Sequence, residues 1–347
     1  MPDPSPAIAA AFNASETSPI NEVPNVLIAI VNYCTADLTI DCLRSLEPEI
    51  IQNPHTIAVV ADNASPDGSL GVIANAIETQ GWSAWARTIA MPRNGGFAYA
   101  TNAIIRNHST CAAFPSYVWL LNSDTVVRPG ALRTMLQFLN ANPEVGIAGS
   151  CLEDPDGTQQ CSAFRFHTLA SEFEGSVSLT VVNRLLQKWA VAPQPTHMTA
   201  PYDWVSGASL LFRGELISTV GLLDERFFLY YEETDFCRRA RAAGWTCWFV
   251  TDSRVVHLVG KSSGMTDRDR RTLRRSDYWF RSRQLYFVKN HGRLYAIVAD
   301  VALALGTLIN RAHSKLRQRP AQIPDYFISD LARNSAILGA LGGVRKK

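Results

Sequence analysis

The sequence lacks the features that mark disulfide frameworks, zinc sites and strongly basic nucleic-acid-binding proteins. It has seven cysteines, an odd number, and none of them forms a C-x-x-C pair. This usage predicts reduced, mostly buried thiols in a cytosolic protein. Lys and Arg total 33 against 31 Asp and Glu, so the formal net charge is only +2. Because this balance gives no overall attraction to nucleic acid, no nucleic-acid partner is expected.

Two common nucleotide-binding fingerprints are also absent. The first apolar run, "VLIAIVNY", is not followed by G-x-G-x-x-G, and no G-x-x-x-x-G-K-[ST] occurs in the chain. A classical dinucleotide-binding turn and a P-loop are therefore disfavoured. Residues 1–24 lack the basic and apolar segments of a signal peptide and are interpreted as a flexible leader. The longest apolar segment, residues 294–309, is shorter than a typical spanning helix and contains Asp300.

The chain does contain a regular alternation of strand-like and helix-like segments. Short apolar, β-branched runs alternate with stretches in which apolar residues recur at helical spacing. This alternation predicts an α/β protein with a mostly parallel sheet. The main expected strands are residues 26–33, 56–62, 117–124, 145–152, 207–213 and 247–257. A helix is expected over residues 232–245, because acidic residues open the segment, Arg residues follow and Gly244 lies near its end.

Polar loops follow four of the expected strands or strand-like runs. They are Asn32-Tyr33, residues 62–65, residues 93–96 and Asn122-Ser123-Asp124. Ligands of open α/β sheets bind at the carboxyl ends of the strands, so we expect these loops to converge on one site. Asn, Asp, Ser and Gly are also common turn formers, and four ordinary turns are the alternative interpretation.

Asp124 is a candidate ligand for a divalent cation. It comes directly after an apolar strand, and His257 comes at the end of a later one. Mg²⁺ and Mn²⁺ take oxygen ligands and often share them with phosphate groups, so this pattern suits a metal that grips a diphosphate. The alternative for His257 is a loop histidine with ordinary hydrogen bonds.

The stretch "FFLYYEETDFC" contains a second candidate site. Glu232, Glu233 and Asp235 lie within four residues, directly after an aromatic run. Crowded carboxylates beside apolar groups have raised pKa values, so one of them could accept a proton from a sugar hydroxyl. The alternative is a solvated acidic helix start that is favourable through the helix dipole.

Seven stretches together resemble a known enzyme family. They include "ADNASPDGS", "RNGGFAYATN", "WLLNSDTVVRPGAL", "DWVSGASLLFR" and "GLLDERFFLYYEETDFCRRARAAGW", and they cover roughly residues 25–265. The chain resembles the inverting glycosyltransferases of family 2, which have a GT-A fold. Within that family it is most similar to the rhamnosyltransferase-like branch that builds bacterial cell-surface polysaccharides.

The resemblance implies a role for each matching position. Asn122-Ser123-Asp124 matches the D-x-D metal motif in its N-x-D form, so Asp124 and His257 would hold Mg²⁺ or Mn²⁺. Trp204 and Gly207 would line the acceptor side. Glu232 to Asp235 matches an E-D-x-D pattern whose second residue is the expected base. The positions expected to bind the donor are Val31, Asn32, Tyr33, Asp62, Asn63, Asn94, Gly96, Asn122 and Ser123.

One position departs from the family pattern. The expected base is usually Asp, but Glu233 stands there and reaches one methylene further. Catalytic geometry is sensitive to about 1 Å. Either the acceptor sits slightly further out, or Glu232 or Asp235 takes part as well.

The resemblance also suggests how the chain is divided. Residues 25–265 would form the GT-A domain, with a nucleotide-binding half over 25–150 and an acceptor half over 151–265. Residues 266–347 are basic and mainly helical by pattern. They contain the apolar run 294–309 with Lys and Arg around it, which is typical of helices that lie in a membrane interface. The alternative is a solvated helix face and ordinary core packing.

These observations lead to two functional hypotheses. The first is a metal-dependent inverting glycosyltransferase that moves rhamnose or a related deoxyhexose from a nucleoside-diphosphate donor to a glycan or lipid-linked acceptor. It would be cytoplasmic and peripheral at the inner membrane. The second is a catalytically silent module that binds nucleotide sugars or glycans on the same scaffold. The intact Asp124 and the acidic cluster favour the enzyme.

Overall fold

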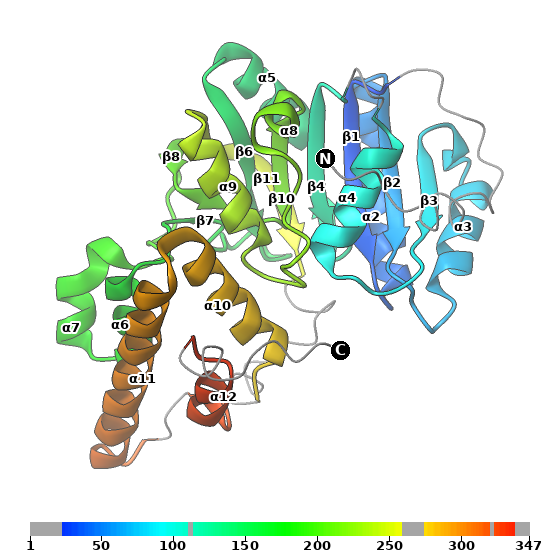
Figure 1. Ribbon diagram of the computed structural model, residues 1–347. Helices are drawn as coiled ribbons and strands as arrows, with labels where there is room; N and C mark the ends of the chain where they lie inside the picture. Colours follow the sequence, from blue (N-terminus) through cyan, green and yellow to red (C-terminus); the bar gives the residue numbers. More distant parts are fainter. Residues whose placement is uncertain (1–22, 110–113, 259–273, 320–322, 337–347) are drawn as a thin grey trace.

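A computed structural model describes residues 23–109, 114–258, 274–319 and 323–336 (Figure 1). The expected leader therefore lies almost entirely outside the described residues. The first half of the fold alternates strands with helices. Its elements are β1 (Val26–Asn32), α2 (Ala36–Gln52), β2 (Thr56–Asp62), α3 (Ser69–Thr79), β3 (Ala86–Ala90), α4 (Phe97–Asn107), β4 (Tyr117–Asn122), β5 (Thr125–Val127), α5 (Ala131–Ala141) and β6 (Val145–Glu153).

The second half begins with small elements and ends with helices. A short 3-10 turn, Gln187–Trp189, follows the helix at Thr180–Leu186. The elements are β7 (Ala163–Phe164), α6 (Leu169–Val177), α7 (Thr180–Leu186), β8 (Ala200–Tyr202), β9 (Trp204–Val205), β10 (Ser209–Arg213), α8 (Glu215–Val220), α9 (Glu232–Ala242), β11 (Thr246–His257), α10 (Asp277–His291), α11 (Arg293–Leu316) and α12 (Phe327–Arg333).

One mixed sheet organises the fold. Its strand order is β3-β2-β1-β4-β10-β6-β11-β5, and β8, outside this order, pairs antiparallel with β11. The strands β3, β2, β1 and β4 are mutually parallel, as expected for the nucleotide-binding half. β10 runs antiparallel to both β4 and β6, and β5 runs antiparallel to β11. The α/β class is therefore confirmed, and β11 of the second half also runs parallel to β6.

Helices cover both faces of the sheet, and alternate residues of β1 show why. Val26, Ile28 and Ile30 pack on the face covered by α2, α3 and α5, while Leu27 and Ala29 pack on the face covered by α4, α8 and α9. Side chains of a strand point to opposite faces in turn, so a run that is apolar at every position is buried on both sides. This explains why the expected strands are continuously apolar.

The C-terminal helices form a separate layer below the sheet in Figure 1. Phe227 and Tyr231 of the sheet domain pack with Tyr286 of α10 and Ala299 of α11 in one apolar cluster. Helix α6, which precedes the expected boundary at residue 266, makes extensive contact with α11. The C-terminal extension is therefore packed against the sheet domain. Residues 259–273, which contain the expected boundary, lie outside the described residues.

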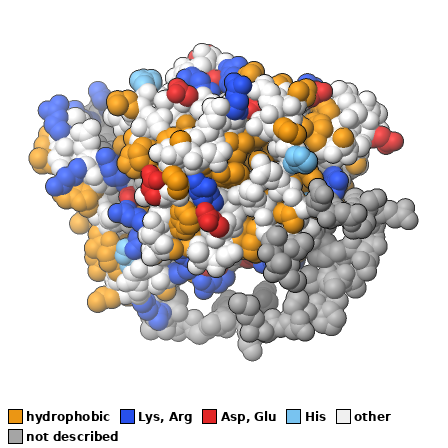
Figure 2. Space-filling view, turned by 90° about the horizontal axis from the view of Figure 1, so that it is seen from above, with side chains coloured by type: hydrophobic (Ala, Val, Ile, Leu, Met, Phe, Trp, Pro, Cys, Tyr) orange, Lys and Arg blue, Asp and Glu red, His pale blue; other side chains and the backbone are white. Residues whose placement is uncertain are grey.

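The surface carries charges of both signs. Figure 2 shows acidic and basic side chains interspersed with hydrophobic ones on the face seen from above. This distribution agrees with the near-zero net charge of +2.

Candidate active site

The ends of three neighbouring strands bring the expected donor-binding residues together. Asn32 at the end of β1 is in register with Asp62 at the end of β2. On the other side of β1, Val31 is in register with Asn122 of β4. The polar loops that follow these strands therefore meet at the carboxyl edge of the sheet, where α/β folds bind ligands.

Asn32 is completely buried and its side chain connects the first loop to its neighbours. Its side-chain amide donates a 2.8 Å hydrogen bond to Asp62, and its carbonyl oxygen accepts from the hydroxyls of Thr35 and Thr39, each at 2.9 Å. The second carboxylate oxygen of Asp62 accepts from the backbone N–H of Ser65 at 2.9 Å. The two side chains thus hold the loops in shape. Tyr33, by contrast, is 43% exposed and its ring is available to a ligand.

Asn63, Asn94 and Gly96 form a second connected group. Asn94 accepts hydrogen bonds from the Asn63 amide at 3.0 Å and from the Gly96 N–H at 3.2 Å. Gly96 has φ +91°, and a Cβ built there would lie 2.1 Å from the carbonyl oxygen of Phe228. That carbonyl accepts the N–H of Phe97 at the start of α4. Only glycine permits this close approach, which joins the donor side to the segment before α9.

The structure places His257 directly beside Asp124. Asp124 is almost completely buried, and its carboxylate lies 3.5 Å from His257 Nε2. The side-chain amide of Asn122 lies 3.4 Å from the same nitrogen. The juxtaposition follows from the sheet, because His257 of β11 is in register with Thr125 of β5. The Ser123 hydroxyl is 3.1 Å from that of Thr35, so this loop also contacts the loop after β1.

A carboxylate and an imidazole at this separation suit one divalent cation. Neighbouring ligands of an octahedral ion with bonds of about 2.1 Å lie roughly 3 Å apart, close to the observed separation of Asp124 and His257. Among the described residues, no group of three or more His, Cys, Asp and Glu side chains is arranged to hold a metal. The residues fit an ion that takes two ligands from the protein and the others from diphosphate and water, as Mg²⁺ commonly does.

Glu232 and Glu233 open helix α9, where Glu232 is buried and Glu233 is half-buried. Burial raises the pKa of both carboxyls, and the charge of Glu233 raises that of Glu232 further. Within the described part of the chain, neither buried Oε2 atom has a hydrogen-bond partner. Backbone N–H groups, including that of Gly207, oppose the rise at Glu233. Raised pKa values and unused acceptor atoms suit a group that takes up a proton.

Asp235 has a different environment from its two neighbours. Its buried carboxylate is 2.9 Å from Arg239 Nε and 2.7 Å from Lys289 Nζ, and it accepts a further bond from Asn290. The contacts with Lys289 and Asn290 hold the helix to α10. The structure therefore gives Asp235 a structural set of partners, and the acceptor atoms that remain open belong to Glu232 and Glu233.

The two acceptor-side candidates also differ. Gly207 lies against Glu233, because a Cβ built there would be 3.6–3.8 Å from the Glu233 side chain. Trp204 is packed into the core, with its ring stacked on Phe164 at 4.2 Å and its indole N–H bonded to the carbonyl of Arg165. Gly207 thus borders the carboxylate directly, whereas the contacts of Trp204 support the chain that leads to it.

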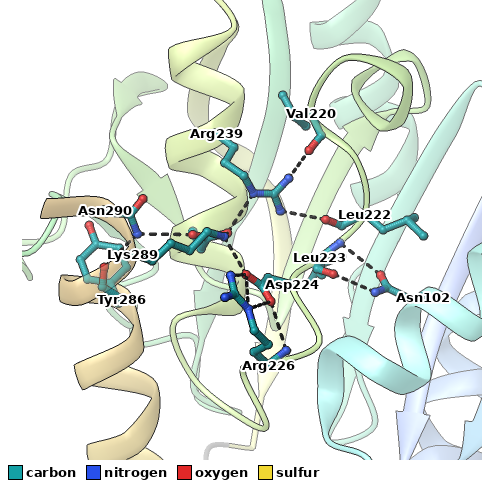
Figure 3. Close-up of polar contacts among 11 residues, drawn as sticks. Asn102, Val220, Leu222, Leu223, Asp224, Arg226, Arg239, Tyr286, Lys289 and Asn290 are labelled. Carbon is teal, nitrogen blue, oxygen red and sulfur yellow. Dashed lines mark hydrogen bonds and ion pairs between the residues drawn. The ribbon is translucent and has the colours of Figure 1, made fainter. Parts of the chain in front are cut away.

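A network that sequence patterns did not reveal holds the segment before α9 (Figure 3). Lys289 of α10 bridges Asp224 at 2.8 Å and Asp235 at 2.7 Å. Asn102 of α4 bonds both the carbonyl and the N–H of Leu223. Lys289 and Asn102 come from elements distant in the sequence, and Lys289 lies beyond the stretches that carry the resemblance. Asn102 ends the matching stretch "RNGGFAYATN", but no local sequence signal links it to Leu223 or links Lys289 to the two aspartates.

The backbone before α9 is strained. Tyr230 and Tyr231 have φ values of +69° and +71°, in the left-handed region that bulky side chains rarely adopt. Such conformations persist only where surrounding contacts impose them, and they cluster at functional sites. Here the ring of Tyr231 is buried against His167, Trp279 and Tyr286. The strain sits immediately before Glu232 and fixes the direction in which α9 starts.

Comparison with known proteins agrees with this geometry. The family described as "Glycosyltransferase like family 2" matches residues 24–277. The chain belongs to this family. It is similar to the N-acetylglucosaminyl-diphospho-decaprenol L-rhamnosyltransferase of Mycobacterium tuberculosis H37Rv, with 27% identity over 59% of this chain and 67% of the relative. It is also similar to the rhamnosyltransferase WbbL of Escherichia coli K12, with 23% identity over 41% of this chain and 52% of the relative.

Solved structures confirm the GT-A fold expected for this glycosyltransferase. The mannosyltransferase PcManGT from Pyrobaculum calidifontis, in complex with GDP-Man and Mn²⁺, superposes with a TM-score of 0.52 at 15% identity. The alignment covers 96% of this chain and 93% of that one. At this identity the likeness shows the shared fold.

Proposed function

We propose that this glycosyltransferase moves rhamnose or a related deoxyhexose from a nucleoside-diphosphate donor to a glycan carried on a lipid. The sugar and the acceptor follow the names of the two rhamnosyltransferase relatives, one of which acts on a diphospho-decaprenol acceptor. The observation that carries the proposal is the meeting of Asp124 and His257 at the carboxyl edge of the sheet, 3.5 Å apart.

Asp124 and His257 would hold Mg²⁺ or Mn²⁺, with the donor diphosphate completing the coordination. When bound, the ion neutralises charge on the departing diphosphate. The loops at Asn32, Asp62 and Asn94 orient the nucleotide beside it. These side chains are already hydrogen-bonded to one another, so little ordering is needed when the donor binds.

Glu233 would remove the proton from the acceptor hydroxyl. Its carboxylate borders Gly207, where no side chain blocks the approach of an acceptor. Burial raises its pKa, which brings the group nearer to the basicity that proton abstraction needs. Direct attack by the activated hydroxyl uses one base and no covalent intermediate, so the configuration at the anomeric carbon is inverted. Glu232 lies beside Glu233, so negative charge on both carboxylates is unfavourable until one of them takes up a proton.

The apolar face of α11 would bring the enzyme to the membrane that carries its acceptor. In the described part of the chain, α11 is the one helix long and apolar enough to cross a membrane by length and composition. Its exposed apolar side chains recur at alternating spacings of four and three, which places them on one face. They are Leu294, Val298, Val301, Leu305 and Leu308, and the exposed Leu316 follows at the end of the helix.

The opposite face of α11 supports a position along the membrane surface. Asp300 is buried and pairs with Arg283 at 2.6 Å, and Asn310 donates to the carbonyl of Ser176 on α6. A spanning helix would have to give up these contacts. The exposed charged residues of α11 include Arg311 and Lys315, and its single acidic residue, Asp300, is buried. An apolar stripe with cationic neighbours suits an anionic lipid surface.

A ligand screen tests the proposed function. Thermal shift is measured with nucleoside diphosphates and nucleotide sugars, with and without Mn²⁺. A donor at 100 times its Kd should stabilise the protein by about 2.7 kcal/mol. We expect the largest shift for a nucleotide-deoxyhexose with Mn²⁺, followed by transfer to a lipid-linked glycan. No shift with any nucleotide sugar would contradict the proposal.

Liposome co-sedimentation tests the membrane surface separately. Val301→Glu and Leu305→Glu should reduce binding to vesicles containing an anionic phospholipid, because each places a negative charge in the apolar stripe. Ile51→Glu is the matched control, since Ile51 is an exposed apolar residue at the end of α2. Surface substitutions are preferred to deletion, because α11 also carries the buried Asp300. If all three variants bind the vesicles equally well, the apolar stripe of α11 has no role in membrane binding.

A further inference from the structure

A cavity of about 400 Å³ lies among α6, α11 and α12. Its lining includes Tyr231, which immediately precedes Glu232 at the start of α9. The cavity therefore reaches the residue before Glu232, while Asp124, the donor loops, Glu233 and Gly207 are absent from its lining. No part of the donor site described above accounts for it.

One side of the cavity is apolar. Trp279 of α10, Leu303 of α11 and Phe327 of α12 line it together with Ile323 and Pro324. Trp279 and Phe327 also contact one another, with ring centroids 6.2 Å apart. This wall suits a hydrocarbon chain, because burying such a chain removes apolar surface from water.

A cation without an ion-pair partner among the described residues lies beside this apolar wall. Arg275 is half-buried and lies over the indole ring of Trp279 at 4.4 Å. Among the described residues it forms no ion pair with a carboxylate, unlike its neighbour Arg274, which pairs with Asp330. A guanidinium stays charged in proteins and presents a fork of donors that matches phosphate oxygens.

Two acidic residues also line the cavity, and one of them is paired. Glu172 is paired with Arg283 at 2.7 Å and lies 3.4 Å from His167. Glu174 has no ion pair among the described residues, and burial raises the pKa of its carboxyl. Arg275 is the one Lys or Arg side chain among the described residues that line the cavity, so it is the group that an incoming phosphate would contact.

We propose that this cavity binds the phosphate end of a lipid-linked acceptor, with the phosphate at Arg275 and the first part of the apolar chain against Trp279 and Phe327. The inference rests on the proposed function and adds to it a site for the lipid carrier. Its position fits that role, because the cavity lies between Tyr231, beside the catalytic segment, and α11, whose outer face carries the exposed apolar stripe.

Isothermal titration with farnesyl diphosphate, below its micelle concentration, tests the site. The parent protein should bind this probe, and Arg275→Gln should weaken binding at least tenfold. Glu174→Gln is the matched control, because it removes a negative charge from the same lining and should leave binding equal or tighter. Farnesol and inorganic diphosphate should each bind more weakly than farnesyl diphosphate, since farnesol lacks the group that contacts Arg275 and diphosphate lacks the chain that contacts Trp279 and Phe327.

Several results would overturn the inference. They are no binding of farnesyl diphosphate, equal binding by Arg275→Gln, or tighter binding of short-chain phosphatidylglycerol, which would make the ligand a membrane lipid. Nucleoside diphosphate with Mn²⁺ is titrated into the same samples. If it binds while farnesyl diphosphate does not, the carrier site fails and the proposed function stands. If no nucleotide or nucleotide sugar binds, the proposed function fails.

Discussion

Replacing Lys289 with Met tests whether the C-terminal helices position the catalytic segment. Lys289 joins Asp224 at 2.8 Å to Asp235 at 2.7 Å, and its side chain is 22% exposed while that of Asp235 is fully buried. Removing one partner of a buried pair costs about 3–5 kcal/mol. Asp235 keeps Arg239 and the lysine is partly exposed, so we expect a loss of about 2 kcal/mol in the free energy of unfolding.

Urea denaturation measures the stability of this variant. Lys315→Met, at an exposed lysine of α11, should stay within about 0.5 kcal/mol of the parent. A double-mutant cycle with Asp224→Asn should show coupling, because the two side chains touch. Turnover should also fall, with the donor KM unchanged, since the perturbed contacts hold α9 and not the donor loops. A loss no greater than that of the control, with unchanged turnover, would refute the positioning role.

Three further predictions concern the site itself. Asp124→Asn should abolish the Mn²⁺-dependent thermal shift and transfer, and an unchanged shift would remove Asp124 from the metal site. Gly96→Ala should weaken donor binding and destabilise the fold more than Gly81→Ala, which shares a positive φ but has open space around it. Burial raises the pKa of Glu233. The transfer rate should therefore fall as the pH decreases, with an apparent pKa above the usual value of about 4.3 for glutamate. An apparent pKa at or below that value would contradict the assignment.

The raised pKa also predicts the sign of a stability effect. A carboxyl whose folded-state pKa is raised opposes folding once the pH exceeds its unfolded value, because the folded state disfavours the charge. Glu232→Gln should therefore increase the free energy of unfolding at neutral pH and leave it nearly unchanged below about pH 4. Thermal or urea unfolding at both pH values measures this, and a loss of stability at neutral pH would contradict it.

Local patterns were sufficient to predict the sheet and the loops at its edge. The run from Val26 to Asn32 is apolar at every position because both faces of β1 are covered, and that pattern is visible in the sequence. The polar loops followed from the same reasoning, since parallel strands end at one edge. The helix beginning at Glu232 was marked by its acidic first turn and by Arg239 and Arg241 near its end.

Contacts between distant segments could not be predicted in the same way. The pairing of β11 with β5, which brings His257 to Asp124, depends on the sheet order, and the sequence predicted a shared role for the two residues but not this pairing. Asp235 is paired, unlike Glu232 and Glu233, partly because of Lys289, which lies 54 residues away in the chain. The left-handed conformation of Tyr231 is imposed by packing and goes against the preference of a bulky residue.

The transfer rate of Glu233→Gln tests the central claim most directly. The variant keeps the size of the side chain but cannot accept the proton, so it should bind nucleotide sugar and Mn²⁺ almost as the parent does. Its transfer rate should fall by roughly 10²–10⁴-fold, and the parent's product should have the inverted anomeric configuration. Near-parent transfer by Glu233→Gln, or a product that retains the donor's configuration, would contradict the account.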